Sequence, residues 1–455
     1  MFSTATVKII CDNSCPTAEE IKISKQLAGQ WNIKKDGTFT IFFGLTSVHV
    51  NITSIEEKGA AIKCSPVLLS RLKLPGDCTL RYSWLASRQE LFLGPVIAVI
   101  TEIKDCNPPS FGTISEFCGE LAMLCEQSGS FFYVTSLSLW TEQTIYGYFY
   151  NHGEWVKEEM PFPSVVHNRI HSRKTEQSSK FQEWLQILKN CGIPHFNDRF
   201  LNKWEVYETL QQFPYLNPYI PHTFLFTSKE VLEQALSQYA CVFLKPVYGS
   251  QGRHIFKVTK ADGGFLLDYT TFQGDIHRTY SSLDKLFATL KNHIKQRPYI
   301  IQQGLALYTY CNSPVDFRIL CHKTDAATWK ATSAVARVSS KNQFVSNIAM
   351  GGNLYKPEEV LLSSFEAKQV KHMKKLLAEL AVETAKCISQ SYDGLYGEFG
   401  MDLAFDKEGN LWLIEVNTKP SKSIQQNPAS SSIRPSVRSI LQCCDLVAQQ
   451  PVRRK

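Results

Sequence analysis

Two polar side chains interrupt an apolar strand near the C-terminal end of the chain. The stretch LWLIEVNTKPS has the pattern of a buried β-strand, yet it carries Glu415 and Asn417 on one face. Side chains two positions apart on a strand share a face and lie ~7 Å apart. A carboxylate in apolar surroundings is costly unless it is paired. Three apolar side chains are expected to anchor the opposite face: Trp412, Ile414 and Val416.

The strand is expected to be the second arm of a hairpin whose first arm, MDLAFD, begins near Asp402. The turn DKEGN would bring Asp402 opposite Ile414 or Glu415. Two carboxylates and one amide then converge, and such oxygen donors, completed by a substrate phosphate, are what Mg²⁺ prefers. The alternative is the solvent-facing side of an ordinary hairpin, which fits Asp406 and Glu408 better than Glu415.

A second candidate site lies in FLKPVYGSQGRHIFKV, where an apolar strand ends at Lys245 and a glycine-containing loop follows. The loop residues of interest are Gly249, Ser250, Gln251 and Gly252. Glycine lets backbone N–H groups close over phosphate oxygens, and a lysine at the strand end supplies a fixed positive charge. The lysine precedes the glycines and a strand follows them, which excludes a Walker A loop. A glycine-rich hairpin turn is the commoner explanation of such a loop.

The strand YIIQQGLAL offers a slot for an adenine ring. Adenine needs apolar walls, one acceptor for its exocyclic amine and one backbone donor. Gln302 could accept, and the backbone near Gly304 and Leu305 could donate, with Gln303 between them. Taken alone, this stretch is no signal of a nucleotide site.

Two arginines stand in otherwise apolar strands, Arg318 in PVDFRIL and Arg337 in AVARVSS. Arginine in such surroundings usually meets a carboxylate or a phosphate. A structural salt bridge explains either arginine equally well when it is considered singly.

Three regions of different pattern must position these residues. Residues 1–93 consist of short alternating runs separated by turn signals, which predicts a small all-β, barrel-like module with a helix at Pro66–Leu72. Residues 94–196 alternate strand and helix and predict a small α/β domain. Residues 197–455 form a longer mixed region that contains every candidate site. The predicted fold class is therefore α/β and multidomain.

Three helices carry clear boundary signals. SEFCGELAMLCEQ predicts a helix over Ser115–Gln127 that is capped by Ser115. SSKFQEWLQILKNCG predicts a helix that ends at Gly192. The apolar periodicity after Glu358 predicts one long helix that continues to about Ser391.

Composition bounds the classes of function. The 455 residues carry 49 basic and 42 acidic side chains, a net charge of +7, which fits a small anionic ligand and does not argue for nucleic acid. The 14 cysteines show no zinc-type spacing and suit a reducing compartment. The chain shows neither a secretory leader pattern nor an 18-residue apolar run, so we expect a cytoplasmic protein without a transmembrane segment.

The order of these motifs resembles the ATP-grasp superfamily of carboxylate–amine ligases. A helix lysine is followed by the Lys-Gly loop, the adenine-type strand, a D-x-R strand and a hairpin with the pattern D-x12-E-x-N-x-x-P from Asp402 to Pro420. The resemblance covers Asn197–Leu446. At full length the chain is similar to the YheC/YheD group of endospore-coat-associated proteins of bacilli, through RFLNKWEVYETL, FLKPVYGSQGRHIF, GLYGEFGMDLAFD and WLIEVNTKPSK.

The resemblance implies a role for each candidate residue. ATP phosphates would be held by Lys203 and Lys245, under a lid formed by Gly249, Ser250, Gln251 and Gly252. The adenine hinge between two subdomains, near residues 300–305, would be Gln302, Gln303, Gly304 and Leu305. Two magnesium ions would be held by Asp402, Glu415 and Asn417. Catalysis would rest on Lys245, Arg318 and Arg337, which steady the γ-phosphate and an acyl phosphate, and Asn347 would contact phosphate or substrate.

The activity implied is ATP-dependent ligation of a small-molecule or peptide carboxylate to an amine, through an acyl phosphate, with a link to sporulation and possible spore-coat partners. The rival interpretation is a spore-associated structural protein that binds ATP without turnover, and an ATP-dependent phosphotransferase is a third. Many relatives have an acidic residue where this chain has Gln302. Lys419, Ser421 and Lys422 could bind a substrate carboxylate or form a polar strand end.

Overall fold

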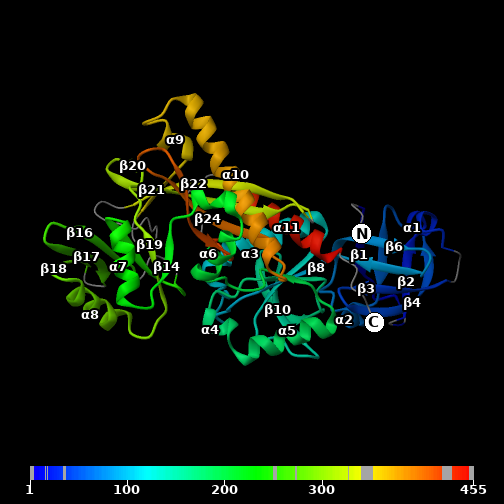
Figure 1. The fold of residues 1–455 in the computed structure, drawn as a ribbon. Coiled ribbons are helices and arrows are strands. Elements are labelled where there is room, and N and C mark those ends of the chain that lie inside the picture. The colour runs from blue at the N-terminus through cyan, green and yellow to red at the C-terminus, as the bar shows by residue number, and fades with distance from the viewer. Residues whose placement is uncertain are drawn as a thin grey trace.

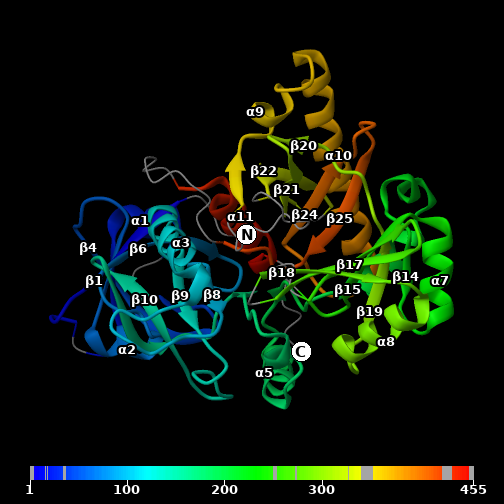
Figure 2. The same ribbon diagram turned by 90° about the vertical axis from the view of Figure 1, so that its left-hand side faces the viewer.

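The protein is built from a barrel and three sheets. The computed structural model describes residues 5–15, 17, 19–33, 37–249, 254–271, 274–325, 327–339, 352–422 and 433–449. Figure 1 shows the barrel at one end of the molecule, the sheet of residues 223–303 at the other, and the remaining layers between them. Figure 2 gives the same arrangement from the side.

The alternating runs predict a small all-β, barrel-like module, and the N-terminal strands form a closed barrel in the order β1-β5-β2-β4-β3-β7-β6. Its alternate side chains, such as Ile21, Ile23 and Ile41, fill the interior. The predicted helix at Pro66–Leu72 is present, and a short helix at Lys25–Gln30 is additional. The elements are β1 (Thr6–Cys11), β2 (Glu20–Ser24), α1 (Lys25–Gln30), β3 (Thr38–Phe43), β4 (Thr46–Ile55), β5 (Ala61–Cys64), α2 (Pro66–Leu72), β6 (Cys78–Leu85) and β7 (Glu90–Leu93).

The first sheet has the order β11-β10-β9-β8-β12-β13, with a parallel centre and an antiparallel edge. Both faces of β8 are buried: Ile97 and Val99 pack toward α3, while Ala98 packs toward α5 and the barrel. The elements are β8 (Val96–Ile100), η1 (Gly112–Ile114), α3 (Ser115–Ser128), β9 (Phe131–Thr135), β10 (Ile145–Asn151), β11 (Glu154–Met160), β12 (Val165–Asn168), α4 (Arg173–Glu176), α5 (Ser179–Cys191) and β13 (His195–Phe196).

The second sheet is antiparallel, in the order β14-β19-β15-β16-β17-β18. Its core includes apolar side chains of α7 and α8, for example Leu232 and Leu286. The elements leading into and forming it are α6 (Lys203–Gln211), η2 (Pro214–Tyr219), β14 (Thr223–Leu225), α7 (Lys229–Gln238), β15 (Cys241–Pro246), β16 (Phe256–Ala261), β17 (Gly264–Thr271), β18 (Gly274–Tyr280), α8 (Leu283–Ile294) and β19 (Tyr299–Gln303).

The third sheet is also antiparallel, in the order β23-β22-β21-β24-β25, with the short β20 paired to β21. The amphipathic helix α10 supplies much of the core beneath it, including Leu377 and Ile388. The elements are β20 (Thr309–Tyr310), β21 (Ser313–Lys323), β22 (Trp329–Val338), β23 (Asn353–Tyr355), α9 (Pro357–Leu361), α10 (Ala367–Ser391), β24 (Glu398–Phe405), β25 (Leu411–Asn417) and α11 (Pro435–Ala448).

Two helix predictions need correction. The helix expected from Glu358 to Ser391 is two helices, because Glu366 has an extended backbone and forms a capping box with Gln369 that starts α10 afresh. Ser115 lies inside α3 rather than capping it; its hydroxyl accepts from the N–H of Phe111 and donates to a carbonyl of η1. The helix predicted to end at Gly192 does so, with that glycine in the left-handed conformation.

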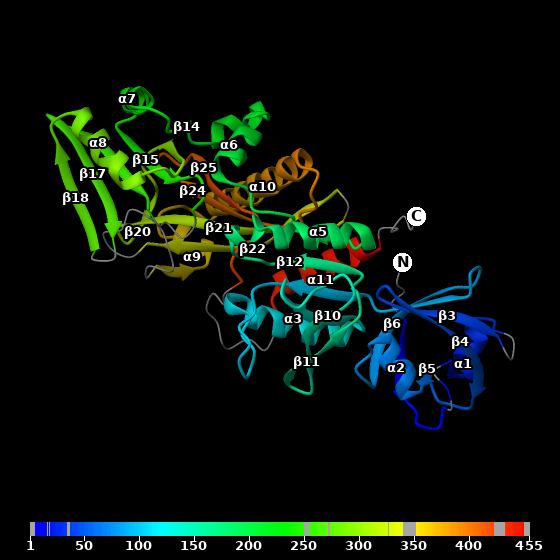
Figure 3. The same cartoon turned by 90° about the horizontal axis from the view of Figure 1, so that it is seen from below.

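The last described helix, α11, packs back onto the first sheet. Val437 and Ile440 lie in the same cluster as Phe117 and Leu121 of α3, and Figure 3 shows α11 between the layers. The predicted boundaries at residues 93 and 196 fall between elements of different sheets, but α11, which lies in the third predicted region, packs on the first sheet. None of the helices in the part of the chain described has the length and apolar character needed to cross a membrane.

Candidate active site

Charged side chains form a row across the third sheet. On adjacent strands Asp316 lies opposite Arg337, Arg318 lies opposite Asp402, and Asp402 lies opposite Glu415. Directly opposed residues of an antiparallel pair share one face. The sheet therefore brings together residues from four strands that are up to about a hundred positions apart in sequence.

Asp402 is enclosed by two guanidinium groups. Arg318 binds it through Nε and through Nη2, which is 2.8 Å from Oδ2, and Nη2 of Arg337 lies 3.0 Å from the same Oδ2. Burial alone would raise the pKa of Asp402, but the two arginines lower it to about 2. Asp402 thus stays ionised throughout the physiological range.

Arg337 also binds Asp316 through Nε, and sequence reasoning assigned no role to this carboxylate. Burial raises the pKa of Asp316 to about 6, against the opposing effect of Arg337. The signal that could have found it is the D-x-R spacing with Arg318, because residues two apart on a strand share a face. A short charged network, rather than a pair of isolated arginines, supports the site.

The hairpin contains a bulge that changes which side chains enter the core. The register shifts between Asp402 and Leu403, leaving Ile414 as an extra residue on β25. Leu413 and Val416 consequently both face the core, joined by Leu411. The expectation that Trp412 and Ile414 anchor the core is wrong: Ile414 lines a cavity beside Glu415, and Trp412 donates its indole N–H to Asp406 at 2.8 Å.

Lys203 joins α6 to the hairpin. Asn202 caps the helix and forms a capping box with Glu205, which places Lys203 at the first helical position. The Lys203 ammonium donates to the carbonyl of Gly249 and to Oε1 of Glu415, both at 2.9 Å. Lys203, whose role the resemblance implies, is therefore in direct contact with Gly249 of the strand-end loop and with the hairpin carboxylate of Glu415.

Lys245 reaches across the second sheet to Gln302, whose Oε1 lies 2.6 Å from Nζ; the Gln302 amide in turn donates to Thr223. Burial lowers the pKa of Lys245 to about 8, an effect that Glu415 opposes. The acceptor that Gln302 was expected to offer to adenine is thus occupied by Lys245. The two side chains, with Lys203 and Glu415, line one small cavity of about 40 Å³ between the second and third sheets.

Of the backbone N–H groups expected to donate to an adenine ring, only one lacks a partner among the described residues. The Gly304 N–H donates to the carbonyl of Cys241 at 2.9 Å, and a Cβ at this position would lie 2.7 Å from that oxygen, which accounts for the glycine. The Gln303 N–H donates to His222. The Leu305 N–H has no partner among the residues that the structure describes, so it is the donor available to a ligand.

The predicted metal triad provides oxygen donors of the right kind. Glu415 leaves one carboxylate oxygen, and Asn417 its amide, without a hydrogen-bond partner in the described ranges, and hard oxygens of this type fit Mg²⁺. In those ranges no three His, Cys, Asp or Glu side chains gather as a metal site, so a metal here would also need the Asn417 amide and phosphate oxygens. Four predicted site residues lie outside the described residues: Ser250, Gln251, Gly252 and Asn347.

Lys419 and Lys422 are committed to buried carboxylates. Lys419 binds Glu176 of α4, and Lys422 binds Glu398 at the start of β24. Both ammonium groups are almost fully buried. Neither interpretation left open for this segment, a substrate-carboxylate contact or a polar strand end, describes Lys419 and Lys422, because both form buried internal ion pairs.

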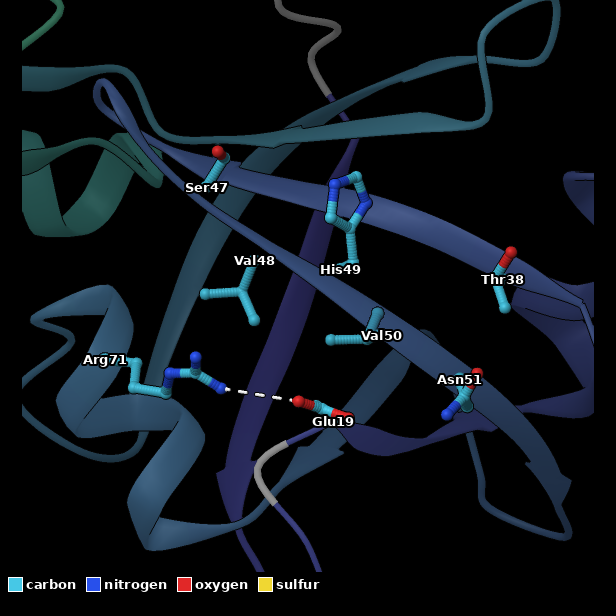
Figure 4. A pocket seen from close by; sticks show the side chains of 8 residues that line it. All are labelled: Glu19, Thr38, Ser47, Val48, His49, Val50, Asn51 and Arg71. Atoms are coloured by element: carbon cyan, nitrogen blue, oxygen red, sulfur yellow. Dashed lines mark ion pairs between the residues drawn. The ribbon is translucent and has the colours of Figure 1, made fainter.

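A larger cavity of about 500 Å³ lies on the barrel (Figure 4). Its charged groups already have partners: Arg71 pairs with Glu19 at 3.9 Å, and His49 bonds to Thr40. The cavity is far from the charged row, and we assign it no role.

Comparison with known proteins places the chain in a family. The family described as YheC/D like ATP-grasp matches residues 192–446. The endospore coat-associated protein YheD of Bacillus subtilis is 29% identical over 407 residues, covering 87% of this chain and 88% of YheD. The endospore coat-associated protein YheC of the same organism is 25% identical over 272 residues, covering 59% of this chain and 73% of YheC.

Among solved structures, the D-alanyl-alanine synthetase A of Vibrio cholerae aligns with a TM-score of 0.45 and 11% identity, over 78% of this chain and 98% of that chain. The family match spans α6, both sheets that line the small cavity, and the whole charged row. The chain belongs to the YheC/D-like ATP-grasp family.

Proposed function

We propose that this protein is an ATP-dependent carboxylate–amine ligase whose active site is the charged row together with the cavity beside it. The observation that carries the proposal is the contact of Lys203 with both Gly249 and Glu415. This contact supports the proposal because Lys203 touches both the loop proposed to bind phosphate and a carboxylate proposed to bind metal. Family membership supports ATP as the nucleotide.

The reaction proposed has two steps. An oxygen of the substrate carboxylate attacks the γ-phosphorus of ATP, the bond to the bridging oxygen breaks, and ADP leaves with that electron pair. The amine nitrogen of the second substrate then attacks the carbonyl carbon of the acyl phosphate. Inorganic phosphate leaves, and the nitrogen loses a proton. Positioning and charge stabilisation supply most of the rate in such phosphoryl transfers.

The roles follow from charge and position. Lys203 and Lys245 neutralise the phosphates of ATP, and Arg318 and Arg337 meet the charge that develops on the transferred group. One or two magnesium ions, held by Asp402, Glu415 and Asn417, would supply further charge neutralisation when bound. Asp402 fits this role only if it exchanges part of its arginine contacts, whereas Glu415 already has a free oxygen.

The cavity of about 40 Å³ holds roughly one water molecule. A nucleotide base therefore requires rearrangement around the Lys245–Gln302 hydrogen bond. Release of Lys245 toward phosphate would free Gln302 as the adenine acceptor, which links the two predicted roles. The Leu305 N–H would be the backbone donor.

The test is hydroxylamine trapping of an acyl phosphate, with ADP release measured in parallel, on a mixture of amino acids and tryptic casein peptides. Glu415→Gln should lower both signals by at least about 100-fold, since it removes charge at the reacting centre. Glu408→Gln, an exposed change in the turn of the same hairpin, is the matched control. A Glu415→Gln variant that retains wild-type rates would contradict the proposal.

A second candidate is a spore-coat-associated protein that binds ATP without turnover, favoured by the names of the two Bacillus subtilis relatives. A link of this chain to sporulation and to coat partners rests on those names alone. Binding of the ATP analogue AMP-PNP without ADP or hydroxamate formation would favour this candidate. Absence of AMP-PNP binding would exclude both.

A further inference from the structure

The turn after β12 carries two polar groups that lack partners. Nε2 of His171 and Nη1 of Arg173 are buried and make no hydrogen bond. Within the described ranges, no carboxylate lies within ion-pair distance of Arg173. Nearly all buried polar groups in folded proteins are satisfied, so an unpaired guanidinium nitrogen calls for an explanation.

Aromatic rings contact the Arg173 side chain but accept no hydrogen bond from its Nη1. Its guanidinium lies 5.1 Å from the ring centre of Phe200 and 6.0 Å from that of Tyr248. Such stacking engages the faces of the guanidinium plane and leaves its in-plane N–H donors free for an acceptor. Arg173 is thus oriented in advance for a planar anion.

The backbone of this turn is fixed by a neighbouring loop. Glu102 accepts the N–H groups of His171 and Ser172 through its two carboxylate oxygens, both at 3.0 Å. The hydroxyl of Ser172 caps the short α4 by accepting the N–H of Thr175. The position of Arg173 therefore does not depend on a ligand.

The turn lies where open α/β sheets bind ligands. From β8 the chain continues to β9 on one side, and β12 pairs with β8 on the other, so the strand order reverses between β8 and β12. Glu102 follows the carboxyl end of β8, and the turn at 169–173 follows that of β12. The crevice outside the carboxyl ends of strands at such a reversal is a general binding position.

The turn lies beside the strand-end loop that is proposed to bind phosphate. Tyr248, which contacts Arg173, directly precedes Gly249, the residue bound by Lys203. Burial lowers the pKa of Arg173, and Glu415 is the carboxylate that most strongly opposes the shift. Arg173 and Glu415 are thus close enough to interact electrostatically, and Arg173 lies outside the family match at residues 192–446.

We propose that Arg173 binds the carboxylate group of the substrate that is to be phosphorylated, with His171 as an adjacent polar contact. The inference deepens the proposed ligase function and rests on it. A guanidinium binds a carboxylate through two parallel hydrogen bonds, which fixes its orientation. Lys203 and Lys245 bind the phosphates of ATP in the proposed function. Arg173 comes from the turn after β12 instead and is available to bind the substrate carboxylate that accepts the phosphoryl group.

The first test is protection of Arg173 from phenylglyoxal in the full-length protein, read by peptide mass spectrometry. With Mg²⁺ and AMP-PNP present, the mixture of amino acids and casein peptides should slow modification of Arg173 about tenfold, as expected for a charge-assisted contact. Arg71, a half-exposed residue of the barrel, is the internal reference and should not change. Protection by AMP-PNP alone would assign Arg173 to ATP phosphate and overturn the proposal, as would no protection.

The second test uses Arg173→Gln and Arg173→Lys, with exposed Lys174→Gln as the matched control. Affinity for ADP should stay within about twofold in all three, while the carboxylate concentration giving half-maximal hydroxamate should rise at least about tenfold in Arg173→Gln and less in Arg173→Lys. Wild-type hydroxamate yield in Arg173→Gln at limiting carboxylate would overturn this inference and leave the proposed function intact. Absent AMP-PNP binding in the wild type would instead defeat the proposed function.

Discussion

Lys245 is a residue whose charge depends on its surroundings. Burial lowers its pKa to about 8 from the ordinary lysine value, and its ammonium is hydrogen-bonded to a neutral amide. A bound polyphosphate would raise that pKa again, so nucleotide binding above pH 8 must take up a proton. Affinity therefore falls as pH rises through the pKa of the free protein.

We expect the dissociation constant of Mg·ADP to rise by up to about tenfold per pH unit above pH 8. Lys245→Met should bind more weakly at neutral pH and lose this pH dependence, whereas the exposed Lys174→Met should behave as wild type. Titration calorimetry between pH 7 and 9.5 measures both. A Lys245→Met variant with the wild-type slope would assign the pH dependence to another group.

At the level of elements, the hairpin of β24 and β25 shows what a sequence pattern can and cannot predict. The sequence predicted the turn, and it predicted that Asp402 lies opposite Ile414 or Glu415; the register places Glu415 there. It also predicted that Glu415 and Asn417 share a face. The bulge at Ile414 was not, because strict alternation would point Leu413 and Glu415 the same way. Trp412 lies outside the core cluster, and Asp406 accepts its indole N–H.

Deleting Ile414 should remove the bulge without changing which side chains face the core, because Leu413 already pairs with Leu403 and Glu415 with Asp402, the next position along β24. Leu413 would stay in the core and Glu415 beside Asp402. We therefore expect the deletion variant to fold and to bind AMP-PNP with an affinity within about tenfold of that of Ile414→Ala. Calorimetric binding and thermal denaturation of the two variants provide the measurement. Loss of AMP-PNP binding in the deletion variant alone would show that the bulge itself positions Glu415.

At the scale of the whole molecule, the layers are joined by charges that no local pattern reveals. Glu398 of β24 is fully buried and accepts from Arg169 at 2.9 Å and from Asn197 at 3.0 Å; the cluster also contains Lys422, His167 and His322. The residues that bind Glu398 are distant from one another in the sequence. Each of them, considered alone, has the character of a surface residue. The barrel and the alternating strand–helix region were predictable because local periodicity indicates them, and the meaning of the motif order came from the resemblance to a known family. The contacts between layers were not.

This buried cluster predicts how stability depends on acid. Burial lowers the pKa of His167 to about 4 and that of His171 to about 3, so both stay neutral in the folded protein while the unfolded chain takes up protons below about pH 6.5. The free energy of unfolding must fall as pH drops from 6.5 to 4, by up to about 3 kcal/mol for His167. Below that range Glu398, whose pKa is held well below its usual value chiefly by Lys422 and Arg169 against the effect of burial, acts in the same direction.

The urea midpoint, followed by tryptophan fluorescence, should therefore decrease between pH 7 and pH 4.5. His167→Gln should make this dependence less steep, because it removes one of the buried groups that protonate only on unfolding, while His171 and His322 remain. His372→Gln, an exposed change on α10, should leave it unaltered. A His167→Gln variant that retains the wild-type pH dependence would show that other groups cause it. The cluster between the first and third sheets would then not be the source of the acid sensitivity.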